Sequence, residues 1–148
     1  MEVYIMKKFA PLLAAVAVLF SIAPTSSFAA HQVSAVQKAQ KNYTLEIKTS
    51  ESTDAGTDSN IKVTIRGSKG SFTKELNGTF EQGDLETFYL SGTDVGEIRS
   101  LTLISDGKGW KSDWEVEYVI LNGLKKTVNS WVSLGGKAGS LDIPLSNK

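Results

Sequence analysis

Residues 43–67 read "YTLEIKTSESTDAGTDSNIKVTIRG", and this stretch decides the fold class of the chain. Segment 43–48 places a Tyr, a Leu and an Ile at every second position, and segment 60–67 does the same with Ile, Val and Ile. Strict alternation rich in β-branched and aromatic residues predicts two strands that each bury one face. The polar stretch between them, "STDAGTDSN" at residues 52–60, predicts a connecting loop.

The same alternation recurs along the rest of the chain, and Gly- and Asn-containing turns such as "NG" at 77–78 and 122–123 separate most of the runs. Further strands are predicted at residues 71–76, 86–90, 98–105, 113–121, 127–134 and 140–145. In segment 113–121 the side chains predicted to point inward are Trp114, Val116, Tyr118 and Ile120. Because each strand has one apolar face, two sheets must pack together. The prediction is an all-β fold, a two-sheet antiparallel β-sandwich of about eight strands.

The first residues of the chain have the pattern of a targeting segment. Two lysines precede an apolar run at residues 9–20, and a small-x-small tripeptide follows at residues 27–29. This pattern predicts a secretory signal peptide and a secreted or periplasmic protein. The predicted organisation is a signal peptide at 1–29, a flexible N-terminal lead at 30–42 and the sandwich domain at 43–148.

The composition excludes several classes of function. Lys and Arg number 16, and Asp and Glu number 16, so no net basic field attracts nucleic acid. There is no Cys, and the only His is His31, outside the predicted sandwich, so a catalytic triad lacks its base and a zinc site lacks its usual ligands. Carboxylates are numerous enough for a glycosidase pair, yet a sandwich with short loops leaves little room for a deep cleft. The chain is predicted not to be an enzyme.

Three acidic loops have the composition of a cation site. They are residues 54–58 ("DAGTD"), residues 81–84 ("EQGD") and residues 106–107 ("DG"). If they meet at one end of the sandwich, they offer carboxylates and glycine-exposed carbonyls, which are the oxygen ligands of calcium. Each loop alone equally fits an ordinary polar turn. The first loop is not an EF-hand, because Ser59 and Ile65 stand where that motif requires Gly and Glu.

Several motifs in order resemble one family. "YTLEIKTSESTDAGTDSNIKVTIRG" is similar to the first two strands of the PLAT (lipoxygenase-homology) domain, including its Ala-Gly-Thr-Asp-x-Asn loop. "FEQGDLETFYL" at 80–90 resembles the family's Phe-x-x-Gly-x-x-Asp-x-Phe segment, with one residue fewer before the aspartate. "DVGEIRSLTLISDGKGWKSDWEVEYVIL" at 94–121 resembles its Gly-x-Ile, strand, Asp-x-x-Gly and Trp-strand run. The resemblance implies a two-sheet sandwich that binds calcium at one end in many members and often acts at lipid surfaces.

The resemblance also implies a set of calcium ligands. By position, the ligands would be the side chains of Asp54, Asp58, Glu81, Asp84 and Asp106 and the carbonyls of Gly56, Thr57 and Gly107. The third loop departs from the family, since it reads "SDGKG" where His-Asp-Asn is usual. The expected function is a secreted, non-catalytic, calcium-binding module that associates with a lipid or membrane surface. The alternative is a protein- or glycan-binding module in which calcium, if bound, is only structural.

Aromatic residues bear on the choice between these functions. Trp114 matches the family-like tryptophan and is expected in the core, whereas Trp110 is additional and lies on a predicted loop. Trp110 either enters the lipid interface, which tryptophan favours, or folds back over the sandwich edge. Tyr89, Tyr118 and Trp131 could serve a protein or glycan partner, although each is expected to be at least half buried.

Overall fold

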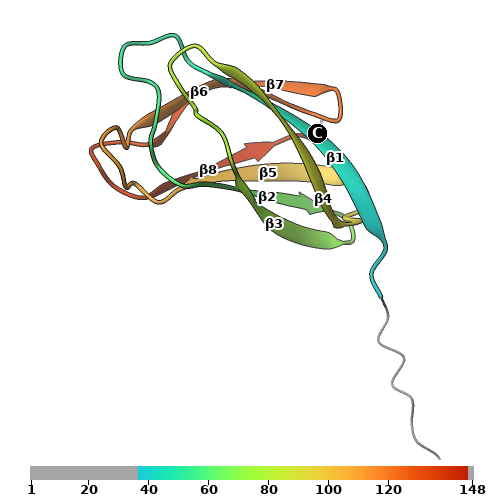
Figure 1. Cartoon of the computed structure of the whole chain (residues 1–148). Helices are drawn as coiled ribbons and strands as arrows, with labels where there is room; N and C mark the ends of the chain where they lie inside the picture. Colours follow the sequence, from blue (N-terminus) through green and yellow to red (C-terminus); the bar gives the residue numbers. More distant parts are fainter. Residues whose placement is uncertain (1–36, 147–148) are drawn as a thin grey trace, which may run out of the picture. The chain divides into compact units, whose positions relative to one another are not determined.

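Residues 37–146 are the part of the chain that the computed structural model describes, and they form eight strands and no helix (Figure 1). The strands are β1 (Gln40–Thr49), β2 (Ile61–Gly67), β3 (Gly70–Leu76), β4 (Leu85–Thr93), β5 (Ile98–Ser105), β6 (Trp114–Leu121), β7 (Leu124–Ser133) and β8 (Gly139–Pro144). Strand β1 begins within the last three residues of the predicted lead. The predicted signal peptide, most of the lead and His31 lie outside the described residues. No helix in the described residues is long and apolar enough to cross a bilayer.

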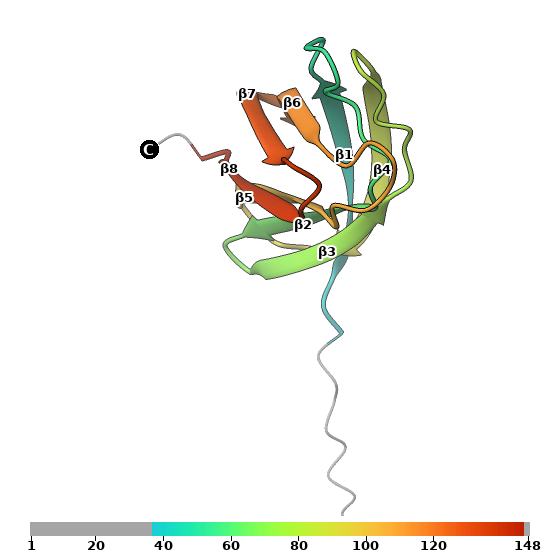
Figure 2. The same ribbon diagram turned by 90° about the vertical axis from the view of Figure 1, so that its left-hand side faces the viewer.

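The strands form two antiparallel sheets of four strands each, which confirms the predicted sandwich. One sheet has the order β4-β1-β6-β7 and the other has the order β3-β2-β5-β8. Figure 2 shows the two sheets as facing layers, with β1, β4, β6 and β7 in one and β2, β3, β5 and β8 in the other. All pairings are antiparallel.

The core lies between the two sheets and is made of the alternating apolar residues. The inward side chains of β1 and β2 are fully buried, as the sequence pattern predicts. Trp114 is also fully buried, and its indole nitrogen donates a hydrogen bond to Thr49 Oγ1 at 3.2 Å. The remaining buried apolar residues of the cluster include Leu76, Phe80, Leu90, Val95, Leu101, Leu103, Val132 and Ile143.

The prediction for the second half of β6 is wrong. Tyr118 and Ile120 are only half-buried, whereas Val119 and Leu121 are fully buried. Against β1 the pairing of β6 shifts register just before Tyr118 and leaves Glu117 as an extra residue. Against β7 the register shifts at the same place, and there two β7 residues, Val128 and Asn129, lie opposite Glu117. Such a β-bulge moves every later side chain to the opposite face of the sheet.

The connections fall into two groups at opposite ends of the sandwich. The odd-numbered strands end at the loop pole, on the left in Figure 1, where the β1–β2 (50–60), β3–β4 (77–84), β5–β6 (106–113) and β7–β8 (134–138) loops gather. The even-numbered strands end at the turn pole, whose connections are β2–β3 (68–69), β4–β5 (94–97) and β6–β7 (122–123). The three acidic loops are therefore all at the loop pole.

Candidate functional site

The β1–β2 loop is held between two neighbouring loops by small polar residues. The Thr57 amide donates to the Phe80 carbonyl at 3.0 Å, and Thr57 Oγ1 donates to the Lys111 carbonyl at 3.1 Å. Ser59 Oγ donates to the Lys108 carbonyl at 2.7 Å. Thr57 and Ser59 are both buried, although the loop is polar. The β1–β2 loop is therefore anchored to both the β3–β4 and the β5–β6 loops.

Two glycines of the predicted ligand set allow the loops to approach one another. A Cβ at Gly56 would lie 2.7 Å from the backbone nitrogen of Gln82 in the β3–β4 loop. A Cβ at Gly107, where φ is 66°, would lie 2.2 Å from the carbonyl carbon of Lys137 in the β7–β8 loop. Neither distance is possible for a real side chain, so glycine is required at both positions for the pole to pack as it does.

Asp58 joins the β1–β2 loop to the β5–β6 loop. Its amide donates to the Lys111 carbonyl at 2.6 Å, and its Oδ2 accepts a hydrogen bond from the Lys111 amide at 3.2 Å. Its Oδ1 accepts no hydrogen bond from the described residues. Asp58 is exposed and borders a polar depression together with Asn60, Glu75 and Glu86. One carboxylate oxygen therefore remains available at this depression.

The Asp106 carboxylate accepts more hydrogen bonds than the Asp58 carboxylate. Its oxygens accept hydrogen bonds from the Asn60 amide at 3.1 Å, the Asn60 side-chain Nδ2 at 2.7 Å and the Lys108 amide at 3.1 Å. The hydrogen bond from the Asn60 side chain, followed by that from the Lys108 amide, lowers the pKa of Asp106 below its ordinary value. The ionised Asp106 thus fastens the β5–β6 loop to the β1–β2 loop.

Asp54 has the freest carboxylate of the first loop. Its φ of 61° is in the left-handed region, and its side chain accepts no hydrogen bond from residues 37–146. It borders a second depression, lined also by Trp110, Lys111, Asp113 and Gly136. Asp54 and Asp58 therefore face separate depressions on either side of the same loop.

The β3–β4 loop contains two of the predicted ligands, and the start of β4 adds one carboxylate that the sequence interpretation missed, Glu86. Asp84 Oδ2 accepts a hydrogen bond from Thr79 Oγ1 at 3.2 Å, and the exposed Glu81 side chain accepts none from the described residues. Glu86 accepts hydrogen bonds from the amides of Thr79 and Phe80 at 2.7 and 3.0 Å. Strand alternation places residues 84 and 86 on one face, and this signal could have identified Glu86.

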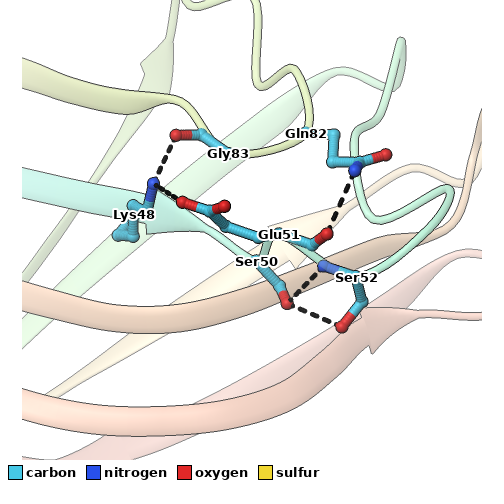
Figure 3. A network of polar contacts seen from close by, with 6 residues as sticks. All are labelled: Lys48, Ser50, Glu51, Ser52, Gln82 and Gly83. Carbon is cyan, nitrogen blue, oxygen red and sulfur yellow. Dashed lines mark hydrogen bonds and ion pairs between the residues drawn. The ribbon is translucent and has the colours of Figure 1, made fainter.

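A surface network ties the start of the β1–β2 loop to the β3–β4 loop (Figure 3). Lys48 Nζ donates to the Gly83 carbonyl and pairs with Glu51 Oε1 at 3.1 Å. The side chain of Gln82 donates to the Glu51 carbonyl at 3.0 Å. Glu51 and Gln82 are exposed and Lys48 is half-buried, so the network orients the loops more than it stabilises the fold.

The carboxylates of the loop pole are distributed and do not form one compact cluster. Within residues 37–146, no three Asp, Glu or His side chains come close enough together to hold a metal ion by themselves. A calcium site here would therefore need backbone carbonyls or water to complete its ligands. The roles assigned to the eight predicted ligands stay predictions.

The exposure of the aromatic side chains tests the predictions made for them, beginning with Trp110. Its side chain is 94% exposed, so it does not fold back over the sandwich edge. Tyr89, predicted to be at least half buried, is 84% exposed, because it lies on the outer face of the edge strand β4. Tyr118 and Trp131 are half-buried, as expected, and the Lys125 ammonium lies 3.6 Å from the centre of the Tyr118 ring.

Sequence comparison relates the chain to lipoxygenase-associated proteins. The PLAT/LH2 domain family matches residues 43–138. An allene oxide synthase-lipoxygenase protein of Plexaura homomalla is 38% identical over 87 residues, which are 53% of this chain and 8% of that protein. Lipoxygenase homology domain-containing protein 1 of Mus musculus is 33% identical over 98 residues, which are 63% of this chain and 5% of that protein. The chain thus spans only a small part of the length of these relatives.

Solved structures agree with this relationship. The structure of a coral 8R-lipoxygenase, described as activated by calcium via a C2-like domain, superimposes with a TM-score of 0.62 and 30% identity, covering 70% of this chain and 17% of that chain. The alpha-toxin of Clostridium perfringens superimposes with a TM-score of 0.58, covering 78% of this chain and 34% of that chain. Its identity of 18% supports a shared fold and nothing further.

Proposed function

Since this chain belongs to the PLAT/LH2 domain family, we propose that it is a non-catalytic module that binds calcium at the loop pole and associates there with lipid or membrane surfaces. One observation carries the proposal. The anchored β1–β2 loop leaves the Asp54 carboxylate and the Gly56 and Thr57 carbonyls free of hydrogen bonds from the described residues, and Asp54 borders the same depression as the exposed Trp110. The calcium-activated coral 8R-lipoxygenase, at 30% identity, supports the calcium part by analogy.

The donor atoms of the loop pole fit a hard cation. Calcium takes about six to eight oxygen ligands in flexible geometry and accepts backbone carbonyls and water among them. In our proposal the main ligands are the Asp54 carboxylate at one depression and the Asp58 carboxylate at the other, with the Gly56 and Thr57 carbonyls of the segment between them. Glu81, Asp84, Asp106 and the Gly107 carbonyl form the surrounding group, of which Asp106 already accepts three hydrogen bonds. Bound calcium supplies positive charge that neutralises these carboxylates.

A non-catalytic role agrees with the chemistry available. The chain has no Cys and a single His, His31, which precedes the sandwich in the sequence. The carboxylates of the loop pole line open depressions, and most of them accept hydrogen bonds from backbone amides or side chains. The function proposed is therefore attachment and targeting.

The membrane contact proposed for Trp110 would be modest by itself. Burying a tryptophan of about 200 Å² contributes at most ~5 kcal/mol at ~25 cal/mol per Å². Immobilisation of the protein at the surface offsets much of this free energy. Stable attachment would therefore need calcium, further contacts or several copies of the domain.

Thermal unfolding in calcium and in chelator tests the ion site. At ~1 mM calcium and a dissociation constant of ~0.1 mM, linkage stabilises the folded state by about 1.4 kcal/mol. The melting temperature should rise by several degrees. Pelleting with phosphatidylcholine vesicles containing phosphatidylserine, with and without calcium, tests the membrane part. An identical melting temperature in chelator and in calcium would contradict the calcium site, and indifference to every vesicle would contradict the membrane role.

We also propose that residues 1–29 are a signal peptide and that the protein is secreted or periplasmic. The proposal depends on the lysine pair, the apolar run and the small residues before the expected cleavage site. Intact mass measurement of the protein from its own cells would test it. A mature protein that begins at residue 30 is expected, and one that retains the apolar run 9–20 would contradict the proposal.

The outer face of β4 favours a second candidate, a protein- or glycan-binding module. Tyr89 is 84% exposed, and Leu85, four residues earlier on the same face, is 52% exposed. Large exposed side chains on one strand face are typical of contact surfaces. In this case vesicles would bind neither with calcium nor without it, and Tyr89→Ser would abolish binding to the partner while leaving the melting temperature unchanged.

A further inference from the structure

The β5–β6 and β7–β8 loops form one continuous tip at the loop pole. The Gly136 amide donates to Asp113 Oδ1 at 3.0 Å, and Ser133 Oγ, at the end of β7, donates to the Ser112 carbonyl at 2.7 Å. The backbone of Lys137 lies against Gly107, as described above. We call residues 106–113 and 134–138 together the double-loop tip.

Each loop of the double-loop tip exposes one large apolar side chain. Trp110 is 94% exposed on the β5–β6 loop, and Leu134 is 59% exposed on the β7–β8 loop. Neither residue belongs to the core. The nearby core residues are Trp114, at the start of β6, and Val132, at the end of β7. Two exposed apolar residues on adjoining loops are unfavourable in water unless another surface covers them.

The double-loop tip also concentrates unpaired positive charge. Lys108, Lys111 and Lys137 are all exposed, and within residues 37–146 none of them forms an ion pair. The two aspartates of the tip, Asp106 and Asp113, instead accept hydrogen bonds from backbone amides. The chain as a whole has no net charge, so this grouping of three lysines on the two loops that expose Trp110 and Leu134 is local.

We propose that the double-loop tip binds anionic phospholipid surfaces directly, with Trp110 and Leu134 entering the interface and the three lysines contacting lipid phosphates. This inference rests on the proposed membrane function and specifies its lipid class. Exposed apolar residues and lysines on the same two loops match the apolar interior and the charged headgroups of an anionic bilayer surface. Because the attraction comes from the lysines, it operates without calcium as a bridge and weakens with salt.

Vesicle partitioning in chelator tests the role of the lysines. The full chain should partition more strongly onto vesicles with phosphatidylserine than onto phosphatidylcholine alone. Each lysine near an anionic surface should contribute about five-fold, so the variant combining Lys108→Gln, Lys111→Gln and Lys137→Gln should lose on the order of 100-fold. Lys38→Gln, Lys74→Gln and Lys126→Gln together are the matched control, because these exposed lysines lie outside the tip. The control variant should retain most of the binding.

Tryptophan emission tests insertion. Emission should shift to shorter wavelength on anionic vesicles. Trp110→Phe should abolish this shift, because Trp114 is already buried and the half-buried Trp131 lies in β7, outside the tip. Leu134→Ser should lower partitioning onto anionic vesicles. Binding to anionic vesicles without an emission shift would overturn the inference. It would indicate that the tip contacts only charged groups, as it would on an acidic protein surface, and that Trp110 does not enter the interface.

The melting measurement in calcium separates this inference from the proposed ion site. Lysine-dependent binding in chelator with no calcium shift would support the inference and contradict the calcium site. The inference is overturned if the protein does not bind anionic vesicles, binds neutral and anionic vesicles equally, or loses as much binding with the control lysines as with those of the tip.

Discussion

The two poles of the sandwich use their polar groups differently. At the turn pole the polar groups form hydrogen bonds with one another. The Tyr43 hydroxyl donates to the Thr93 carbonyl at 3.1 Å and accepts from the Val95 amide at 3.0 Å. Asp94 accepts from the Gly96 amide at 3.0 Å and lies 3.5 Å from Lys69 Nζ. The turns there are short, and the protein itself occupies the Tyr43 hydroxyl and the Asp94 carboxylate.

The loop pole, by contrast, is anchored from within and open at its surface. Buried Thr57 and Ser59 fix the backbone, while Asp54 and one oxygen of Asp58 accept no hydrogen bond from the described residues. The apolar side chain of Trp110 is similarly exposed. This difference is the reason why our proposal places the external ligand at the loop pole.

The largest effect is expected from the side chain that closes the core beneath the loop pole. Phe80 is buried and packs against Trp114 and Phe88, with ring centroids 5.1 and 5.7 Å away. Phe80→Ala should lower the free energy of unfolding by about 3–5 kcal/mol, measured by denaturant titration. Leu124→Ala, at an exposed position of the turn pole, is the control and should change it little. If Phe80→Ala changed the free energy of unfolding only slightly, the packing of Phe80 against Trp114 and Phe88 would not be what stabilises the core beneath the loop pole.

A smaller loss is expected at the turn pole when its buried hydrogen bonds are broken. Tyr43→Phe keeps the ring but leaves the buried Val95 amide without its acceptor. The free energy of unfolding should fall by about 1–3 kcal/mol. Calcium should stabilise this variant as much as the unchanged protein. A lost calcium response would show that the two poles are not independent.

The calcium response should depend on the loop pole alone. Asp54→Asn combined with Asp58→Asn should abolish the stabilisation of about 1.4 kcal/mol expected at ~1 mM calcium, measured as the difference in melting temperature between calcium and chelator. Asp94→Asn removes an aspartate at the turn pole and is the matched control. If Asp94→Asn abolished the response and the loop-pole variant kept it, the assignment of the poles would be reversed.

Acid should destabilise both poles through one carboxylate each. Hydrogen bonds lower the pKa of Asp106, chiefly that from the Asn60 side chain, and the pKa of Asp94, chiefly that from the Gly96 amide. A carboxylate with a lowered folded-state pKa stabilises the fold above its ordinary pKa, and this stability is lost as the pH falls through the folded-state value. Asp106→Asn and Asp94→Asn should each flatten the fall in melting temperature on acidification. Unchanged acid profiles in both variants would contradict these assignments.

The smallest effect is expected from the surface network at the base of the loops. Glu51→Gln removes the ion pair with Lys48 but leaves the Glu51 carbonyl to accept from Gln82. An exposed pair of this kind contributes about 0–1 kcal/mol, so the melting temperature should move very little. A loss of stability well above that range would mean that the network contributes substantially to the stability of the fold, contrary to its assigned role of orienting the loops.

Sequence alternation predicted the strands because each sheet buries one face, and the alternating residues of β1 and β2 are indeed buried. It failed after Val116 because the bulge at Glu117 arises where β6 pairs with β1, and no local pattern contains that pairing. The exposed Trp110 lies on the β5–β6 loop, which contacts the β7–β8 loop through Asp113 and Gly136, and that contact is equally invisible in the sequence. Non-local contacts explain both differences.

The same limit applies to the candidate site. Acidic loops could be identified from their composition, but not which oxygens the protein itself would occupy. Asn60 engages Asp106, and the Lys111 amide engages one oxygen of Asp58, through contacts between loops far apart in sequence. Glu86 was missed because its role, holding the Phe80 amide, appears only once the β3–β4 loop is folded.

Residue-resolved NMR during calcium titration tests the central claim most directly. Amide signals of residues 54–58 should move with calcium, followed by those of residues 81–84 and 106–107, while residues 94–97 of the turn pole should stay unchanged. Saturation should occur at roughly 0.1–1 mM, the range of extracellular calcium modules. Signals that remain still throughout, or that move equally at both poles, would contradict a calcium site at the loop pole.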